Sequence, residues 1–275
     1  MPELPETETI ARDLDREIRG RTIVSTVVQR GDVLREVNAQ DLALLANGAT
    51  ITRCWRRAKM VVLDLHSGHR MVVQPRFTGA LLLVAGSLPD REAAYSTMRF
   101  RLDDGRDLHY RDIRRLGTVS VMNPERFAAY VALLGIEPLD PAFTDAHLSG
   151  LLRASRQAVK KVLMDQRAVV GIGNIYANEA CWRAGMDPSR ESRSVAASEV
   201  TALREGIVTV LAESIAARGT SFRDYVDASG GKGDFERSLA VYGRGGEPCL
   251  RCGARLVETH AVDGRTTVLC ARCQR

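Results

Sequence analysis

The sequence predicts an α+β protein in which an antiparallel β-sandwich or barrel is followed by a helical region and then by a cysteine-rich hairpin. Three observations predict this order. Short β-type runs lie between residues 22 and 122, apolar residues at helical spacing follow residue 135, and two Cys-x-x-Cys pairs lie near the C-terminal end. We expect three corresponding domains, at residues 1–134, 135–238 and 239–275.

The strands are predicted where apolar residues, many of them β-branched, alternate with polar ones or run together. Asp104-Gly105, between two such runs, is a strong signal for a hairpin turn. A helix is predicted before the strands because Ile10, Leu14 and Ile18 repeat at four-residue spacing. The predicted strands cover residues 22–28, 60–66, 79–86, 98–104, 106–110 and 118–122.

The second part of the chain has the spacing of amphipathic helices. Its apolar residues recur three and four positions apart, as in Val200, Leu203, Ile207 and Leu211. A turn-rich stretch at 136–143 separates this region from the strands. The glycine-rich stretch 228–246 is predicted to be a loop or linker.

The cysteines indicate a metal site. Cys249 and Cys252 form one pair and Cys270 and Cys273 the other, as in tetrathiolate zinc sites. We expect one structural Zn²⁺, because four thiolates leave no coordination position open for a substrate or water. The other two cysteines are expected to be ordinary buried thiols.

Composition restricts the function less than the motifs do. The net charge of +5 and a pI near 9.0 are compatible with a polyanionic partner but do not identify one. We find no apolar run long enough for a membrane helix, and the acidic N-terminal segment is unlike a signal peptide. These features favour the cytoplasm, or the nucleoid of a bacterium.

The N-terminal end offers a nucleophile. If Met1 is removed, Pro2 carries a free secondary amine, and free α-amines have a pKa of roughly 8. Such an amine can attack a sugar C1′, displace the base and leave an iminium that permits elimination of the 3′ phosphate. Glu3 and Glu6 are carboxylates suited to proton transfer beside it. The alternative interpretation is an acidic tail without a catalytic role.

Two further motifs could bind phosphate. Gly171 and Gly173 predict a tight turn that Asn174 closes as the N-cap of a helix, and N–H groups at such a turn suit an anion. The alternative is a packing turn between helices. Arg265 lies at the tip of the predicted hairpin, where it could contact a phosphate or simply be exposed.

Five motifs occur in a fixed order along the chain: MPELPETETI at the start, Lys59 within RRAKMVVLDL, DIRRLG at 112–117, GIGNIYANE at 171–179 and the four-cysteine tail. Together they resemble formamidopyrimidine-DNA glycosylase and its relative endonuclease VIII, from residue 2 to the C-terminal end. The PELPE start is more similar to the formamidopyrimidine branch.

The resemblance implies an N-terminal β-sandwich, a helix-two-turn-helix domain and a zinc finger, with DNA bound between the domains. It implies a monomeric base-excision repair enzyme, a bifunctional glycosylase and abasic-site lyase that flips a damaged base out of duplex DNA. The implied catalytic residues are Pro2 as Schiff-base nucleophile, Glu3 as proton donor, Lys59 as acid/base of β-elimination and Arg265 for phosphate binding and δ-elimination. Glu6 and Glu179 are supporting residues, and the implied DNA contacts are Tyr95, Arg114, Arg153 and Asn174.

Three positions depart from the family pattern. Phe77 replaces the usual methionine that enters the vacated base stack, Leu116 replaces the usual phenylalanine, and Gln74 replaces a histidine. Phe77, Arg114 and Leu116 can still act as a wedge, since apolar side chains of several kinds separate bases. We therefore expect activity on oxidised purines, and these three positions are where a shift in the choice of lesion or opposite base would originate.

Three alternatives stay open from the sequence. One is an endonuclease VIII-type enzyme for oxidised pyrimidines. Another is a DNA-binding homologue without turnover, against which the retained Pro2, Glu3 and Lys59 argue. The third is a zinc-ribbon interaction module, which the N-terminal motif disfavours.

Overall fold

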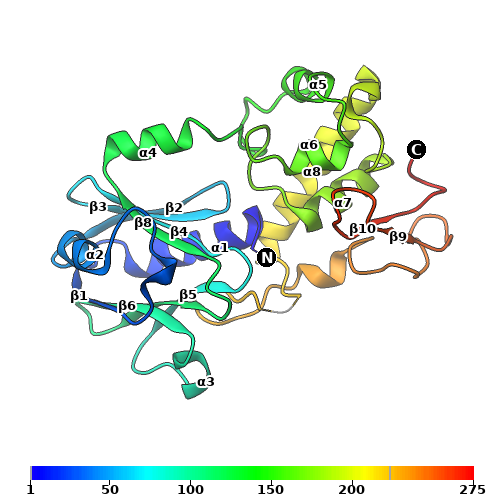
Figure 1. Ribbon diagram of the computed structural model, residues 1–275. Helices are drawn as coiled ribbons and strands as arrows, with labels where there is room; N and C mark the ends of the chain where they lie inside the picture. Colours follow the sequence, from blue (N-terminus) through cyan, green and yellow to red (C-terminus); the bar gives the residue numbers. More distant parts are fainter. Residues whose placement is uncertain (1, 223) are drawn as a thin grey trace. The chain divides into compact units, whose positions relative to one another are not determined.

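The computed structural model describes residues 2–222 and 224–275 (Figure 1). Its contacts divide the chain into two compact units. The first comprises Met1–Ala132 and Ala217–Asp234, and the second comprises Leu133–Ala216 and Phe235–Arg275. Within the described ranges, no helix is both long and apolar enough to cross a membrane.

The first unit is the predicted antiparallel β-sandwich. One four-stranded sheet has the order β1-β6-β7-β5 and the other has the order β2-β3-β4-β8. All the strand pairs within both sheets are antiparallel. The strands are β1 (Ile23–Val28), β2 (Ile51–Arg57), β3 (Met60–Leu65), β4 (Arg70–Gln74), β5 (Gly79–Val84), β6 (Ser96–Leu102), β7 (Asp107–Asp112) and β8 (Thr118–Met122).

The core of this unit lies between the sheets and is closed by α1 (Leu4–Ile18). Ile10, Leu14 and Ile18 on α1 are fully buried in one cluster with side chains of both sheets, such as Leu63 and Phe100. Each such burial contributes roughly 1.5–3 kcal/mol, so the spacing that predicted the helix also positions it. The remaining helices of the unit are η1 (Gly31–Val33), α2 (Ala39–Ala46), α3 (Asp90–Ala93) and α4 (Pro124–Val131).

All six predicted strands are present, together with two that the sequence analysis did not predict. The additional strands, β2 and β4, contain arginines among their apolar residues. In β2, Arg56 is held by an ion pair and Arg53 lies over the ring of Trp55. Neither strand has a period-two pattern to detect, because β2 has a register shift between Ile51 and Arg53 and β4 has three buried residues in a row.

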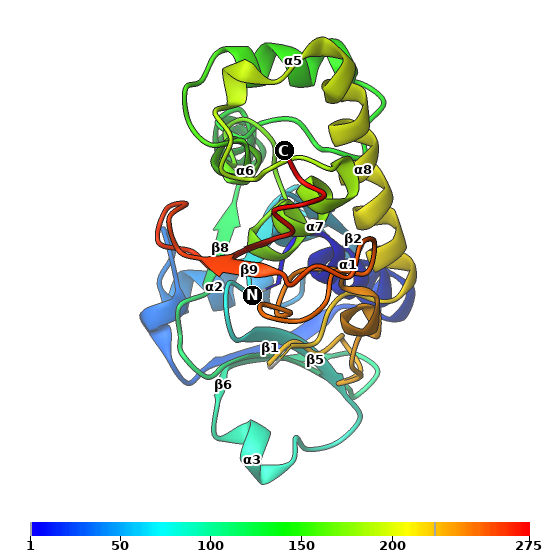
Figure 2. The ribbon, with the colours of Figure 1, turned by 90° about the vertical axis from the view of Figure 1, so that its right-hand side faces the viewer.

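The second unit contains four α-helices and a small two-stranded hairpin. Part of this hairpin is seen in orange and red in Figure 2. Helix α7 packs against both α6 and α8. Gly206 on α8 permits this approach, because a Cβ atom there would lie 2.9 Å from the carbonyl oxygen of Ala180. The elements are α5 (Asp145–Arg153), α6 (Val159–Met164), α7 (Asn174–Ala184), η2 (Ser192–Ser194), α8 (Ala197–Ala216), η3 (Phe235–Ser238), β9 (Val257–Thr259) and β10 (Thr267–Leu269).

The glycine-rich segment 228–246 has little regular structure, as predicted, but side chains fix its backbone at several points. Asp227 Oδ1 accepts N–H bonds from Ser229 and Gly231, and Ser221 Oγ accepts one from Gly233. The division between the two units falls within this segment, after Asp234. The segment is therefore an anchored connection rather than a free linker.

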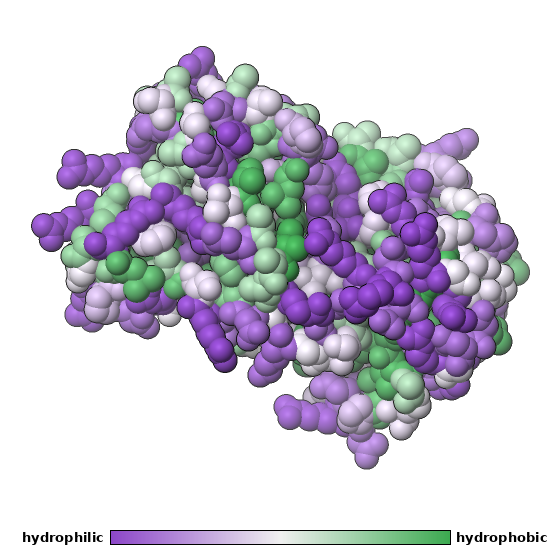
Figure 3. Space-filling view, turned by 180° about the vertical axis from the view of Figure 1, so that it is seen from behind, coloured by the Kyte–Doolittle hydropathy of each residue, from purple (hydrophilic) through white to green (hydrophobic). Residues whose placement is uncertain are grey.

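The surface is predominantly polar. On the face shown in Figure 3, hydrophilic side chains predominate and hydrophobic ones form limited patches. Some large apolar side chains are nevertheless exposed, and Phe77, Ile113 and Leu116 in two loops of the first unit are among them.

Candidate active site

The start of α1 holds the proposed nucleophile in ordered structure. Pro2 is buried directly before the helix, and Glu3, only 1% exposed, occupies the N-cap position. The backbone N–H of Glu3 donates to Glu6 Oε2 at 2.8 Å, and Thr220 N–H donates to Glu6 Oε1 at 2.8 Å. The Glu6 carboxylate thus fixes the backbone beside Pro2 and joins it to residues 217–234 of the same unit. Met1 lies outside the described residues.

Lys59 lies in the tight turn between β2 and β3, in the same unit. Ala58 before it has a left-handed backbone, with φ of +53°, and is buried. The carbonyl oxygen of Ala58 accepts a hydrogen bond of 3.1 Å from Arg56 Nη1, while Arg56 Nε bonds Glu8 Oε2 at 2.7 Å. The turn that carries Lys59 is therefore tied to the helix that begins after Pro2.

The three predicted wedge residues come from two neighbouring loops of the first unit. Phe77 lies in loop 75–78, and Arg114 and Leu116 lie in loop 113–117. Phe77 is 45% exposed and Leu116 is 41% exposed, which is unusual for side chains of this size. The guanidinium carbon of Arg114 lies 5.2 Å from the centre of the Phe77 ring. The structure thus brings Arg114 and Phe77 together.

The N-cap of α7 is Gly173, whereas the sequence predicted Asn174. The helix begins at Asn174 as its first residue, and its N-cap is Gly173, with an extended backbone. No side chain caps the helix, and the Nδ2 group of Asn174 donates to the carbonyl oxygen of Thr266 at 3.1 Å. Asn174 therefore fixes the tip of the β9–β10 hairpin.

Glu179, on the same helix, is fully buried, and its carboxylate accepts N–H bonds from three successive residues of another segment. The donors are Ala240, Val241 and Tyr242, at 2.8–2.9 Å. Burial raises the pKa of Glu179, whereas these three N–H groups lower it, and the net shift is upward. Its observed contacts hold the backbone that leads into the cysteine-rich hairpin.

Arg265 lies at the hairpin tip with a half-exposed side chain next to an anchored residue. The carbonyl oxygen of Thr266 accepts bonds from Asn174 and, at 2.8 Å, from the ammonium of Lys160, which is fully buried. Asp263 pairs with Arg265 at 3.6 Å and with Lys161 of α6 at 3.3 Å. Lys160, Lys161, Asp263 and Arg265 are among the residues that line a cavity of about 670 Å³ between α5, α6 and the hairpin tip.

Two predicted DNA contacts are exposed residues. Tyr95 lies between α3 and β6 and is 41% exposed, while its carbonyl oxygen accepts the N–H of Asp112 at 3.0 Å. Arg153 is the exposed last residue of α5. Tyr95 belongs to the first unit and Arg153 to the second.

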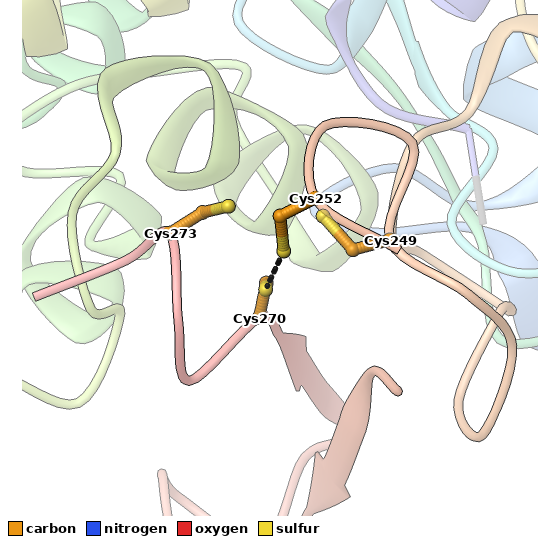
Figure 4. A group of neighbouring side chains, drawn as sticks. All are labelled: Cys249, Cys252, Cys270 and Cys273. Atoms are coloured by element: carbon orange, nitrogen blue, oxygen red, sulfur yellow. Dashed lines mark hydrogen bonds between the residues drawn. The ribbon is translucent and has the colours of Figure 1, made fainter. Parts of the chain in front are cut away.

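The four predicted cysteine ligands converge on one point, as Figure 4 shows. Their sulfur atoms all lie within 4.8 Å of one another, and those of Cys252 and Cys270 are 3.5 Å apart. Zinc–sulfur bonds of about 2.3 Å place the sulfurs of a tetrahedral site roughly 3.8 Å apart, so the cluster fits this ion. Burial would raise the pKa of Cys249, but the N–H groups of Arg251 and Cys252 help lower it to about 6, which favours the thiolate.

Comparison with known families accounts for nearly the whole chain. Residues 1–119 match the formamidopyrimidine-DNA glycosylase N-terminal domain, and residues 134–226 match the H2TH domain of the same family. Residues 246–275 match the zinc finger found in FPG and IleRS. The chain belongs to the formamidopyrimidine-DNA glycosylase family.

Individual relatives agree with this assignment. The formamidopyrimidine-DNA glycosylases of Xanthomonas campestris pv. campestris (strain B100) and Desulfitobacterium hafniense (strain DSM 10664 / DCB-2) are 41% and 39% identical, over the full length of both chains. The Lactococcus lactis Fpg in complex with abasic-site DNA has a TM-score of 0.91 at 28% identity, covering 99% of each chain. Its complex with DNA containing N7-benzyl-Fapy-dG has a TM-score of 0.92 at 29% identity, covering all of both chains.

Membership of the formamidopyrimidine-DNA glycosylase family and the convergent cysteines together establish one structural zinc ion, as the sequence predicted. The α+β fold and the order of β-sandwich, helical domain and zinc finger are also confirmed. The roles of the individual catalytic and DNA-binding residues stay predictions.

The two units divide the predicted site residues between them. The first unit contains Pro2, Glu3, Glu6, Lys59, Phe77, Tyr95, Arg114 and Leu116, and the second contains Arg153, Asn174, Glu179, Arg265 and the four cysteines.

Sequence reasoning missed the residues that hold these side chains in place. Arg56 and Glu8 position the turn of Lys59, and Lys160 anchors the hairpin beside Arg265. Glu8 and Arg56 lie inside two of the recognised motifs, MPELPETETI and RRAKMVVLDL, whereas Lys160 lies outside every motif. A charged residue gives no indication in the sequence that the fold will bury it against a distant partner.

Proposed function

We propose that this member of a DNA glycosylase family excises oxidised purines from duplex DNA through a Schiff base on Pro2 and then nicks the strand. The observation that carries the proposal is the arrangement of the side chains at the N-terminal end. Pro2 and the Glu3 carboxylate are held together at the start of α1, and the backbone between them is fixed by Glu6. We place this activity in the bacterial cytoplasm, at the nucleoid.

The first step joins the Pro2 nitrogen to C1′ of the damaged nucleotide. The bond between C1′ and the base breaks, its electron pair leaves with the base, and Glu3 supplies a proton for this cleavage. The Pro2 nitrogen then loses its proton and the bond between C1′ and the ring oxygen breaks. The ring oxygen keeps the electron pair and takes up a proton to become a hydroxyl, which leaves an iminium between the Pro2 nitrogen and C1′. The burial of both residues supports this role, because charge interactions strengthen where water is excluded.

The iminium withdraws electrons, so a proton can leave C2′ and the 3′ phosphate can depart in β-elimination. Lys59 is proposed as the acid/base group of this step, and the Glu8–Arg56 connection supports the proposal because it fixes the turn that carries Lys59. Arg265 is proposed to bind phosphate and to assist δ-elimination, which removes the second phosphate. Its half-exposed side chain on an anchored hairpin supports this assignment.

The substrate class is proposed from related complexes. Lactococcus lactis Fpg has been solved with DNA that contains an abasic site and with DNA that contains N7-benzyl-Fapy-dG. We therefore propose 8-oxoguanine and formamidopyrimidine lesions, and abasic sites, as substrates of this chain.

Oxidised pyrimidines are a second candidate class. One observation favours them: the Lactococcus lactis protein has also been solved with DNA that contains an oxidised pyrimidine, and this structure matches all of both chains with a TM-score of 0.91. Excision of dihydrouracil at a rate similar to that of 8-oxoguanine would support this broader specificity.

Borohydride trapping tests the mechanism. Enzyme with a free Pro2 amine, incubated with an 8-oxoguanine duplex and borohydride, should form a stable covalent adduct, because the reagent reduces the iminium. Enzyme that keeps an extra residue before Pro2 should form none, since an acylated nitrogen has no lone pair to donate. Pro5→Ala is the matched control, because the nitrogen of Pro5 lies inside the chain and cannot act as the nucleophile.

Undiminished trapping by enzyme with a blocked N-terminal end would overturn the role of Pro2 and direct attention to Lys59. Binding of lesion DNA without excision or trapping by the free-amine enzyme would instead support a DNA-binding homologue without turnover.

A further inference from the structure

The two loops that carry the exposed Phe77 and Leu116 are adjacent because of the sheet topology. Loop 75–78 connects β4 to β5, and loop 113–117 connects β7 to β8, so each crosses from one sheet to the other. β4 pairs with β8 up to Gln74 and Thr118, and β5 pairs with β7 from Gly79 and Asp112. The residues that flank loop 75–78 therefore pair in the sheets with the residues that flank loop 113–117.

Buried polar side chains join the two loops further. Thr78 Oγ1 donates to Asp112 Oδ1 at 2.5 Å and accepts the N–H of Arg114 at 2.9 Å. The other carboxylate oxygen, Asp112 Oδ2, accepts the N–H of Gly117 at 2.8 Å and the hydroxyl of Tyr110 at 3.3 Å. Thr78 is 4% exposed and Asp112 is 1% exposed, so water cannot easily replace these bonds.

The space around this pair is filled. A Cβ atom on Gly117 would lie 1.8 Å from the hydroxyl oxygen of Tyr110 and 2.8 Å from the carbonyl oxygen of Gln74. A Cβ on Gly79 would lie 2.5 Å from the carbonyl oxygen of Pro75. The loops therefore have little freedom to shift independently of each other.

The outer side of the same loops is unusual for a protein surface. Each loop has one arginine with a left-handed backbone, Arg76 at φ +53° and Arg115 at φ +51°. Each loop also exposes a large apolar side chain, and Arg114 covers the ring of Phe77. Uncommon backbone conformations persist only where the surrounding structure fixes them, and they are frequent at functional sites.

We infer that Thr78 and Asp112 are positioning residues that hold Phe77, Arg114 and Leu116 as one preassembled wedge for insertion into the base stack. The inference rests on the proposed function. Insertion separates stacked bases at a cost of a few kcal/mol, so a wedge that is already ordered loses less freedom on entering DNA. Thr78 is central because its one hydroxyl bonds both the Asp112 side chain and the Arg114 backbone.

Thr78→Val tests the inference, because valine keeps the shape of threonine and removes the hydroxyl. Thr78→Ser keeps the hydroxyl and should restore wild-type behaviour. Thr97→Val is the matched control, since Thr97 is 1% exposed and its hydroxyl bonds the carbonyl oxygen of Tyr110 in the same sheet. Thermal unfolding of all three variants reports any general loss of stability.

Two reactions distinguish an effect on the position of the wedge from an effect on the chemical steps at Pro2. Excision of 8-oxoguanine from a duplex requires the base stack to open, whereas borohydride trapping on a single-stranded abasic oligonucleotide does not. Thr78→Val should reduce kcat/KM for duplex excision by roughly tenfold or more, because both buried hydrogen bonds of the Thr78 hydroxyl are lost. It should leave single-stranded trapping within about twofold of wild type. A 2-aminopurine beside the lesion should show correspondingly slower unstacking.

Each outcome is decisive. Equal duplex excision and unstacking by wild type and Thr78→Val would overturn the inference. The same losses in Thr97→Val, or in Thr78→Ser, would also overturn it by showing a general effect on the sheet. Absence of trapping in the wild type itself would refute the proposed function instead, which keeps the two failures distinguishable.

Discussion

Arg56 joins the strand before Lys59 to the first helix through Glu8: its Nε donates to Glu8 Oε2 at 2.7 Å, while its Nη1 bonds the carbonyl oxygen of Ala58. Burial would raise the pKa of Glu8, but the charge and hydrogen bond of Arg56, with those of Arg12, hold it below its usual value. The Glu8 carboxylate therefore stabilises the folded state when it is charged.

Glu8→Gln should lower the free energy of unfolding at pH 7 by about 1 kcal/mol, allowing for partial solvent screening. Because the pKa of Glu8 is depressed in the folded state, its contribution is present above its unfolded value of about 4.5 and is lost as pH falls through the folded value. Urea unfolding at pH 7 and at pH 3 checks this, and the difference between variant and wild type should shrink at pH 3.

The control for this prediction is Glu247→Gln, which removes a carboxylate that is 54% exposed and paired with Arg244. A surface pair of this kind should contribute less than about 0.5 kcal/mol. An equal loss of stability from both variants, or a Glu8→Gln difference that does not depend on pH, would contradict the importance of the Glu8–Arg56 connection.

Cys252→Ser should remove zinc and weaken DNA binding while the β-sandwich stays folded. The finger has only a small apolar cluster of its own, so the metal must supply much of its folding free energy. Metal analysis should give one zinc per wild-type chain and much less in the variant. Cys181→Ser, at a buried cysteine outside the metal cluster, should keep zinc, and a purified wild type without zinc would refute the site.

The features that the sequence predicted are those encoded by local patterns. The apolar spacing of Ile10, Leu14 and Ile18 predicted α1, and the turn signal Asp104-Gly105 predicted the β6–β7 hairpin, where Gly105 has φ of +83°. The cysteine spacing predicted the ligands of the zinc site for the same reason, since each pair is local.

The features that it did not predict depend on long-range contacts. Residues 217–234 return to the first unit, where the carboxylates of Asp13 and Asp227 both pair with Arg218, at 2.5 Å. The contact between Glu6 and Thr220 likewise joins positions far apart in the chain. Charge pairing at such separations leaves no periodicity, so the bounds of the three predicted domains rested on local patterns, namely strand-type runs, helical spacing and paired cysteines.

Asp263→Asn should strengthen binding to undamaged duplex DNA by several-fold at low salt. Asp263 now pairs with both Lys161 and Arg265, and its neutralisation frees two cations for phosphates. Asparagine tolerates the left-handed backbone of this position, φ +58°, so the fold should persist. The measurement is the dissociation constant over a salt series, in which the slope should become steeper by about one to two phosphate contacts.

The control for Asp263→Asn is Glu258→Gln, an equal change of net charge on the same finger. If both variants raise affinity equally, total charge rather than the pairing of Asp263 explains the effect. Arg265→Ala should act in the opposite direction, weakening all sequences alike and reducing the salt slope by about one.

Glu3→Gln should slow release of the damaged base but not the reaction of Pro2 with an abasic site. Glutamine keeps the size of the side chain but cannot supply a proton as a carboxylic acid does, so release of 8-oxoguanine should fall by about 10²-fold or more. Trapping at a preformed abasic site should persist, because no base remains to be expelled and the Pro2 amine is unchanged. Single-turnover excision and borohydride trapping, measured on the same preparation, give the two rates.

The abasic reaction also serves as the internal control for the folding of Glu3→Gln, since a variant with a disordered N-terminal end would lose both activities. Equal losses in the two assays would show that Glu3 supports the position of Pro2 rather than the departure of the base, and an unchanged excision rate would assign the proton to another group.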